Sequence, residues 1–290
     1  MKKIIVVLFA LLLLAGCSNK NHYSYLSDGD DLIFKGPNDV TYTKNDLYKS
    51  LKVSNEDAIT SDILDKIATK IEGVDLEALE AEADELIETY QSLGYESYIV
   101  ASYGSVDAYR KAYISTLLMN ELAKEYVRLN YDSMLEEKKP VKMQVAIFAN
   151  EEDAQKCIDD VNSGSTFDMA AVNNNAESAP ISSVYTDDDT SLVLEVKEYL
   201  NSTDNTGLST IIVNTKTATD TDGNSVETKT YYVLNIESRN PDDFKDDLIQ
   251  LLASGLDSST VKSYFLATHE IEFFDQDIYE LMTTAYEVLK

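Results

Sequence analysis

The sequence predicts an α+β fold in which a small antiparallel sheet is inserted between two helical segments. Apolar residues recur at helical spacing over roughly 55–138 and again over 241–290. Between these segments, 209–215 and 229–237 are rich in β-branched and aromatic residues and flank an Asp-Gly pair, which is typical of a hairpin turn. Because helical segments stand on both sides of the strands, the sheet is expected to be an insertion.

The helices of the first segment can be placed from their end signals. Thr43 precedes Asp46 by three residues, which predicts a capping box and a short helix that runs through Leu51. Longer apolar repeats follow and end at Gly73, at Gly94 and before Pro140. The last of these repeats, which starts after Ser105, is expected to form one continuous helix.

The inserted segment alternates between strand and helix patterns. A strand is expected at 143–148, an amphipathic helix at 151–162 and a short helix at 167–172. A further helix is expected near 191–200, in an otherwise acidic and loop-rich stretch. The C-terminal segment is expected to hold helices at 242–252, 259–267 and 276–289, with an extended stretch at 271–275.

The N-terminus has the three parts of a secretory signal. Lys2 and Lys3 precede an apolar stretch that is too short to span a bilayer, which needs roughly 20 residues. The sequence LAGC at 14–17 resembles the lipobox of bacterial lipoproteins, so 1–16 is interpreted as a signal peptide and Cys17 as the lipidated mature N-terminus. The polar residues 17–31 are then expected to tether the protein to the extracytoplasmic face of a Gram-positive-type cell membrane.

The charge balance excludes one large class of partners. The chain has 52 acidic and 24 basic residues, for a net charge of −28. It lacks the cations that would bind nucleic acid through the phosphates, so no nucleic-acid partner is expected. Anionic lipid and anionic wall polymer should also be repelled.

Cysteine chemistry and metal binding have few candidates. With Cys17 assigned to lipid, Cys157 has no partner for an intrachain disulfide, and its place on an apolar helix face favours a core position over a nucleophile. The acidic run 187–189 is interpreted as a solvated turn. The sequence DTDGN at 220–224 lacks the register of an EF-hand loop, which favours a hairpin tip. No zinc cluster or catalytic triad can be assembled, so no metal or cofactor is expected.

Tyrosine is unusually frequent, with 19 copies in a chain that has no tryptophan. Ordinary half-buried packing is the favoured interpretation. The alternative is an amphipathic surface for unfolded polypeptide, since tyrosine combines apolar area with a polar tip. The tyrosines in question lie in the first helical segment, at Tyr90, Tyr95, Tyr98, Tyr103, Tyr109, Tyr113, Tyr126 and Tyr131.

The chain resembles the PrsA/SurA-type foldases, which are extracytoplasmic chaperones with a parvulin-type prolyl isomerase domain. Residues 41–48 (TYTKNDLY) resemble the entry helix of this family, and 93–110 resemble the stretch before its long helix. The order of elements in 141–172 matches the opening of a parvulin domain, and 208–213 and 231–237 resemble its closing strands.

This resemblance implies a division of the chain. Residues 32–140 and 239–290 would together form a helical chaperone module. Residues 141–238 would form an inserted parvulin-like domain with a four-stranded antiparallel sheet plus helices. The implied partners are unfolded or partly folded exported polypeptides, together with the membrane through the lipid on Cys17. A homodimer is left open.

The expected catalytic positions depart from the family. Parvulins carry a histidine on the first strand and another on the last strand of the site, and these positions are Val145 and Tyr232 here. The two histidines of the chain, His22 and His269, lie outside the expected sheet domain. Phe167 is the remaining candidate for the pocket. The resemblance therefore implies a degenerate domain whose isomerase activity is weak or lost.

Two loops also depart from the family pattern. Residues 183–187 stand where the family has a glycine-rich turn, and the closing hairpin is enlarged, with 214–230 in place of a tight loop.

Three functions follow as alternatives. The first is a chaperone that holds unfolded exported chains near the membrane. The second is a prolyl isomerase with a rearranged pocket. The third is a lipoprotein that binds a dedicated ligand or partner, which ranks last because the sequence offers no pair of lobes around a hinge.

Overall fold

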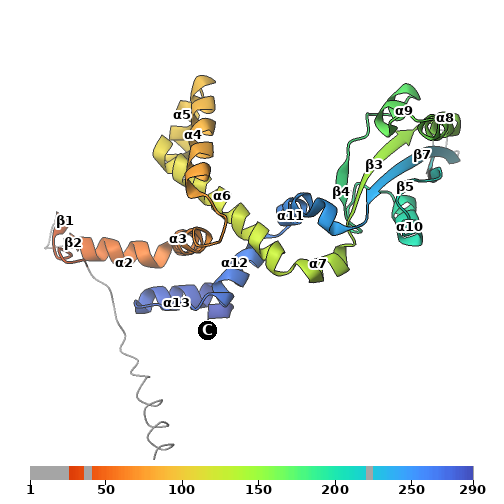
Figure 1. The fold of residues 1–290 in the computed structure, drawn as a ribbon. Helices are drawn as coiled ribbons and strands as arrows, with labels where there is room; N and C mark the ends of the chain where they lie inside the picture. The colour runs from red at the N-terminus through yellow and green to blue at the C-terminus, as the bar shows by residue number, and fades with distance from the viewer. Residues whose placement is uncertain (1–25, 36–40, 220–224, 290) are drawn as a thin grey trace, which may run out of the picture. The chain divides into compact units, whose positions relative to one another are not determined.

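The computed structural model describes residues 26–35, 41–219 and 225–289, and Figure 1 shows their secondary structure. The chain forms two compact units: unit 1 comprises 1–122 with 257–290, and unit 2 comprises 123–256. The signal peptide, Cys17, His22, most of the tether and the hairpin tip at 220–224 lie outside the described residues. The domain boundaries at 140/141 and 238/239 remain a prediction.

Unit 1 is mainly helical, as expected. The capping box before its first described helix is confirmed: Thr43 N donates to Asp46 Oδ2 at 2.8 Å, and Asp46 N donates to Thr43 Oγ1 at 3.2 Å. The elements are β1 (Leu32–Lys35), β2 (Thr41–Thr43), α2 (Lys44–Ser54), α3 (Glu56–Ala68), α4 (Leu76–Ser92), α5 (Glu96–Tyr103), the first part of α6 (Val106–Leu129), α12 (Ser258–Thr268), α13 (Gln276–Ala285) and η3 (Glu287–Leu289).

The two ends of the chain meet inside unit 1. Helix α13 contacts α2 and α3, and α12 contacts α3. On α2, Lys52 Nζ lies 2.9 Å from Asp275 Oδ2 and 2.8 Å from Asp277 Oδ2, which stand at the start of α13. Asp275 also caps α13, because its Oδ1 accepts a hydrogen bond from Ile278 N at 3.1 Å. A buried ion cluster therefore joins segments that lie more than 200 residues apart.

Unit 2 contains an antiparallel sheet. Its elements are the end of α6, α7 (Tyr131–Lys138), β3 (Val141–Phe148), α8 (Glu151–Asn162), α9 (Phe167–Asn173), β4 (Ser183–Tyr185), α10 (Leu194–Ser202), β5 (Gly207–Leu208), β6 (Ile212–Thr219), β7 (Ser225–Ser238), η2 (Pro241–Phe244) and α11 (Lys245–Ser254). The strand order is β4-β3-β7, with β5 and β6 both paired to β7. The predicted α+β fold class is confirmed.

Strands β5 and β6 follow one another along the same edge of β7, so the sheet is four positions wide. Between them, Ser209 keeps the edge bonded: its N donates to Leu234 O at 2.8 Å, and its Oγ accepts from Leu234 N at 2.8 Å. A buried serine therefore replaces one step of the ladder.

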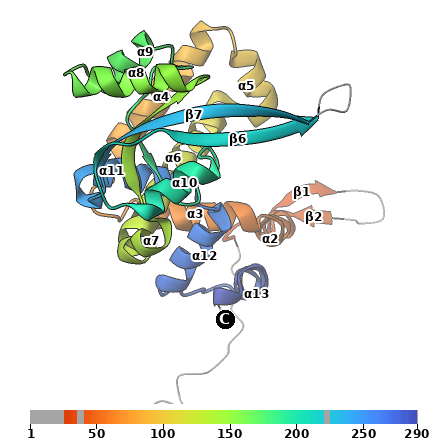
Figure 2. The ribbon, with the colours of Figure 1, turned by 90° about the vertical axis from the view of Figure 1, so that its right-hand side faces the viewer.

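Two apolar clusters cover the two faces of the sheet. Side chains alternate between faces along a strand, so Ala146 and Phe148 of β3 pack against α8 and α9, whereas Met143 packs near Val196 of α10. Figure 2 shows α8 and α9 on one side of the strands and α10 on the other. Cys157 is fully buried in the first cluster.

The structure differs from the expected elements in several places. The helix expected at 276–289 ends at Ala285, and the short η3 follows it. The helix after Ser105 is not continuous: it breaks at Asn130, whose Nδ2 donates back to Tyr126 O at 2.8 Å. Residues 183–185 form the edge strand β4, and the hairpin strands extend beyond the expected ends.

In the ranges given above, no helix has the length and apolar character needed to span a membrane.

Candidate functional site

Five tyrosines of unit 1 line one cavity of about 720 Å³, which we call the tyrosine groove. Helix α5 forms its centre, and α4 and α6 contribute one ring each. Gly94 and Gly104, with φ of 80° and 82°, permit the sharp chain reversals on either side of α5. The lining residues are Tyr90, Tyr95, Tyr98, Ile99, Ser102, Tyr103 and Tyr109.

The rings of the groove hold one another in place. Tyr103 and Tyr109 meet edge to face with ring centroids 4.9 Å apart, and Tyr90 lies 6.1 Å from both Tyr95 and Tyr109. Burial raises the pKa of the Tyr109 hydroxyl, so this group stays neutral over the physiological range. The groove is therefore a preformed aromatic surface without a charge of its own.

Ordinary packing does not explain all of these tyrosines. Tyr95, Tyr98 and Tyr103 are exposed, and 70% of the surface of Tyr98 is open to solvent. Tyr95 and Tyr103, at 52% and 48% exposed, are half-buried as that interpretation has them, whereas Tyr98 is more open. Contiguous exposed apolar groups on a soluble unit mark an interaction site more often than isolated ones do.

A bidentate ion pair fixes two walls of the groove. Arg110 of α6 lies with Nε 2.6 Å from Asp84 Oδ1 and Nη2 3.0 Å from Asp84 Oδ2 on α4. The hydrogen bonds from Arg110 hold the pKa of the Asp84 carboxyl below its usual value. The pair links α4 to α6, the two helices that contribute Tyr90 and Tyr109 to the groove.

A second cavity lies on the α10 face of the sheet, with a volume of about 320 Å³; we call it the sheet-face pocket. Val145 and Tyr232 both line it, because Val145 pairs with Leu234 and Ile147 with Tyr232 across adjacent strands. Burial raises the pKa of both Tyr185 and Tyr232, whose hydroxyls are neutral donors. Ile181, which is 75% exposed, stands at the edge of this pocket.

Phe167 does not lie with these residues. It is 5% exposed and packs with Ala146, Phe148 and Val233 on the opposite face of the sheet. Its expected place in the pocket is therefore corrected to a place in the core. Tyr185, which the sequence analysis did not select, lines the pocket instead because 183–185 forms a strand.

The histidines provide no group to the sheet-face pocket in the part of the chain that is described. His269 lies in unit 1 after α12, where its Nδ1 is 3.0 Å from Phe265 O. Where the resemblance implies two imidazoles, the pocket presents a valine and a tyrosine. It can bind an apolar side chain and donate hydrogen bonds from its tyrosines, but it has no base among its lining residues.

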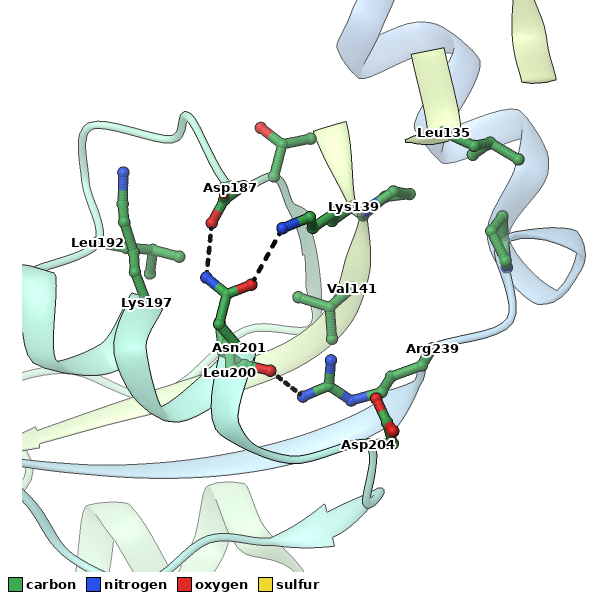
Figure 3. A pocket seen from close by; sticks show the side chains of 13 residues that line it. Leu135, Lys139, Val141, Asp187, Leu192, Lys197, Leu200, Asn201, Asp204 and Arg239 are labelled. Atoms are coloured by element: carbon green, nitrogen blue, oxygen red, sulfur yellow. Dashed lines mark hydrogen bonds between the residues drawn. The ribbon is translucent and has the colours of Figure 1, made fainter. Parts of the chain in front are cut away.

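A third cavity, of about 340 Å³, surrounds the C-terminal end of α10 (Figure 3). Arg239 donates from Nη2 to Leu200 O at 3.1 Å, and Asn201 Nδ2 donates to Asp187 Oδ1 at 3.0 Å. Lys139 and Lys197 also line the cavity. Cations at this position satisfy carbonyl groups and balance the negative end of the helix dipole, so we interpret the cavity as structural.

The remaining sequence candidates have local explanations. Asp188 pairs with Lys138 Nζ at 2.7 Å and Asp189 accepts from Ser191 Oγ at 2.7 Å, so the acidic turn is bonded within unit 2. Desolvation raises the pKa of Cys157 to about 11, which keeps the buried thiol protonated. No group of three potential metal ligands occurs among the described residues.

Comparison with protein-family models gives a match at the N-terminus. The model of the prokaryotic membrane lipoprotein lipid attachment site matches residues 1–18, which include Cys17. The predicted location, lipid-anchored at the extracytoplasmic face of the cell membrane, is thereby confirmed. No curated protein sequence matches the chain.

Comparison with solved structures returns PrsA proteins. The foldase PrsA of Streptococcus pneumoniae is 18% identical, with 88% of this chain and 99% of that chain covered and a TM-score of 0.44. The peptidylprolyl isomerase PrsA of Bacillus cereus is 16% identical, with coverage of 90% and 100% and a TM-score of 0.47.

Proposed function

We propose that this protein is a lipid-anchored foldase that holds unfolded segments of exported polypeptides, and that its parvulin-like unit does not catalyse isomerisation. The observation that carries the proposal is the tyrosine groove, a preformed aromatic cavity with three exposed rings. The lipid on Cys17 would keep this groove where exported chains emerge.

Tyrosine suits a client that has no fixed structure. Each ring offers a large apolar face and a hydroxyl that donates to any nearby carbonyl, so it accepts many side chains without a fixed geometry. One aromatic contact adds about 0.5–1.5 kcal/mol beyond burial, whereas a micromolar complex needs about 8 kcal/mol. Several rings must therefore act together, which gives weak and reversible binding.

The test is suppression of aggregation of reduced insulin, followed by light scattering with equimolar mature protein. We expect suppression by the wild type and its loss in Tyr98→Ser/Tyr103→Ser. The matched control is Phe274→Ser/Tyr279→Ser, which removes two exposed aromatic rings of unit 1 outside the groove. If the wild-type protein leaves insulin aggregation unchanged, the foldase proposal is rejected. If both double variants lose the suppression of aggregation equally, the tyrosine groove is not the binding site.

Prolyl isomerisation is the second candidate, because Val145 and Tyr232 line an apolar pocket of suitable chemistry. The barrier to rotation about the prolyl bond is ~18–20 kcal/mol, and lowering it requires polar groups placed against the amide. Our proposal expects no acceleration of proline-limited refolding at substoichiometric protein. Acceleration that is lost in Tyr232→Ala would establish this second candidate in its place.

A further inference from the structure

The enlarged hairpin carries a free sheet edge. Strand β6 pairs with β7 from Ile212↔Tyr232 to Thr219↔Ser225, and the described residues contain no strand on the other side of β6. Residues 215–219 and 225–229 are exposed on both faces. Figure 2 shows the two strands continuing together as a ribbon past the rest of the sheet.

The register shows which backbone groups face outward. Leu234 exchanges hydrogen bonds with Ser209 on the β5–β6 side of β7, and backbone groups alternate between sides along a strand. Even-numbered residues of β7 therefore bond to β6, and their partners there include Lys216 and Ala218. The N–H and C=O groups of the odd-numbered residues Thr215, Thr217 and Thr219 then point away from β7, along the free edge.

This edge has only one of the usual protections against strand addition, the single lysine Lys216. Natural edges are blocked by proline, by bulges, by charged side chains or by short length. Strand β6 has eight residues, contains no proline, keeps an unshifted register with β7 and has Lys216 as its one charge. Its remaining residues beyond Asn214 are threonine and alanine, which suit an extended pairing.

Charge argues for an unfolded client over a second copy of the chain. Two molecules of net charge −28 repel one another at close approach. Residues 215–229 carry two basic and three acidic side chains, so the hairpin has a net charge of only −1 and does not repel a neutral segment. Pairing through main-chain groups also places no demand on client sequence.

We propose that residues 215–219 of β6 bind an extended segment of an unfolded polypeptide as an added strand. This inference rests on the proposed function and adds a second, backbone-directed contact to the side-chain contacts of the tyrosine groove. The added strand would bond to Thr215, Thr217 and Thr219 and leave the ladder between β6 and β7 intact.

Hydrogen exchange measured by NMR on the wild-type mature protein tests the proposal directly. The probe is reduced and carboxamidomethylated ribonuclease A, which cannot refold. In free protein, the amides of Thr215, Thr217 and Thr219 should exchange faster than those of Lys216 and Ala218. With bound probe, exchange of the three threonine amides should slow by about tenfold, while the two internal controls change little.

A variant pair tests the same edge by affinity, with fluorescein-labelled probe and anisotropy as the readout. Thr217→Pro removes an outward N–H without removing a ladder bond, so it should fold and weaken binding by about fivefold, the effect of roughly one hydrogen bond. Thr217→Val keeps the N–H and should bind as the wild type does.

The outcomes separate the two proposals. If the probe binds while the threonine amides exchange at the same rate as before, strand addition at β6 is refuted and the foldase proposal is unaffected. Probe that does not bind at all, with aggregation unaffected, overturns the foldase proposal and the edge with it. Threonine amides that are protected without probe and lose protection on dilution would show that a second copy occupies the edge, which also overturns the inference.

Discussion

Replacing Lys52 by methionine should destabilise unit 1 strongly. The side chain of Lys52 is 5% exposed, and its ammonium contacts the carboxylates of Asp275 and Asp277, of which the first is 7% exposed. Lys52→Met keeps most of the apolar stem but leaves two like charges beside each other without their cation. Removing one partner of a buried ion pair costs about 3–5 kcal/mol, most of it from the uncompensated charge.

The expected shift in thermal stability follows from the size of the unit. The described part of unit 1 has about 125 residues, for which 1 kcal/mol corresponds to roughly 3–5 °C in Tm. The melting transition of unit 1 should therefore fall by about 9–25 °C in calorimetry. The matched control is Lys49→Met on the exposed side of the same helix, which should change stability by no more than about 0.5 kcal/mol.

A third variant isolates the charge effect. Lys52→Met/Asp275→Asn/Asp277→Asn removes all three charges, and the amide oxygen introduced by Asp275→Asn can still cap α13. This triple variant should be more stable than Lys52→Met alone, because no buried carboxylate is left without its cation. The reasoning is refuted if the free energy of unfolding of Lys52→Met lies within about 1 kcal/mol of the wild-type value. It is also refuted if the triple variant is no more stable than the single one.

Two further substitutions and one reactivity measurement have separate readouts. Phe167→Ala should destabilise unit 2 by about 3–5 kcal/mol in urea unfolding and leave the unit 1 transition in place; a loss below about 1 kcal/mol would contradict its core position. Cys157, with its pKa raised to about 11, should resist Ellman's reagent at pH 8 in folded Cys17→Ser protein and should react after urea is added. Because the folded state favours the neutral thiol, its contribution to the free energy of unfolding is present at neutral pH. That contribution is lost as the pH rises above the pKa of the thiol in the unfolded chain. Cys17→Ser should also move the protein from the membrane fraction to the medium, and retention at the membrane would count against lipid anchoring through this residue.

Local signals in the sequence were sufficient for most elements. The Thr43 and Asp46 capping pair, the glycine stops and the alternation in β3 each depend on nearby residues, so they could be placed without tertiary information. The break at Asn130 could not, because asparagine inside a helix gives a weak signal and no glycine or proline stands there. The burial of Lys52 was equally hidden, since its carboxylate partners come from the other end of the chain.

The candidate sites show the same division. Val145 and Tyr232 were selected through the family resemblance alone, and the register of β3 and β7 places both on one face of the sheet. Phe167 was misplaced because no local pattern shows which face of a sheet a following helix will cover. The exposure of Tyr98 was hidden for a related reason: whether a tyrosine on a short helix is covered depends on which other helix packs beside it.

Three features of the chain fit the proposed function together. Under that proposal, Val145 and Tyr232 stand where two histidines would be expected, so the sheet-face pocket keeps an apolar lining but offers no imidazole. The enlarged hairpin adds main-chain donors and acceptors at 215–219, and the tyrosine groove adds aromatic area in unit 1. Under the same proposals, main-chain contacts at 215–219 and aromatic contacts in the tyrosine groove would together accept unfolded segments of many different sequences. If the protein instead turns over a proline-limited substrate, the proposed loss of catalysis is wrong, because catalysis would then have been kept by groups other than imidazole.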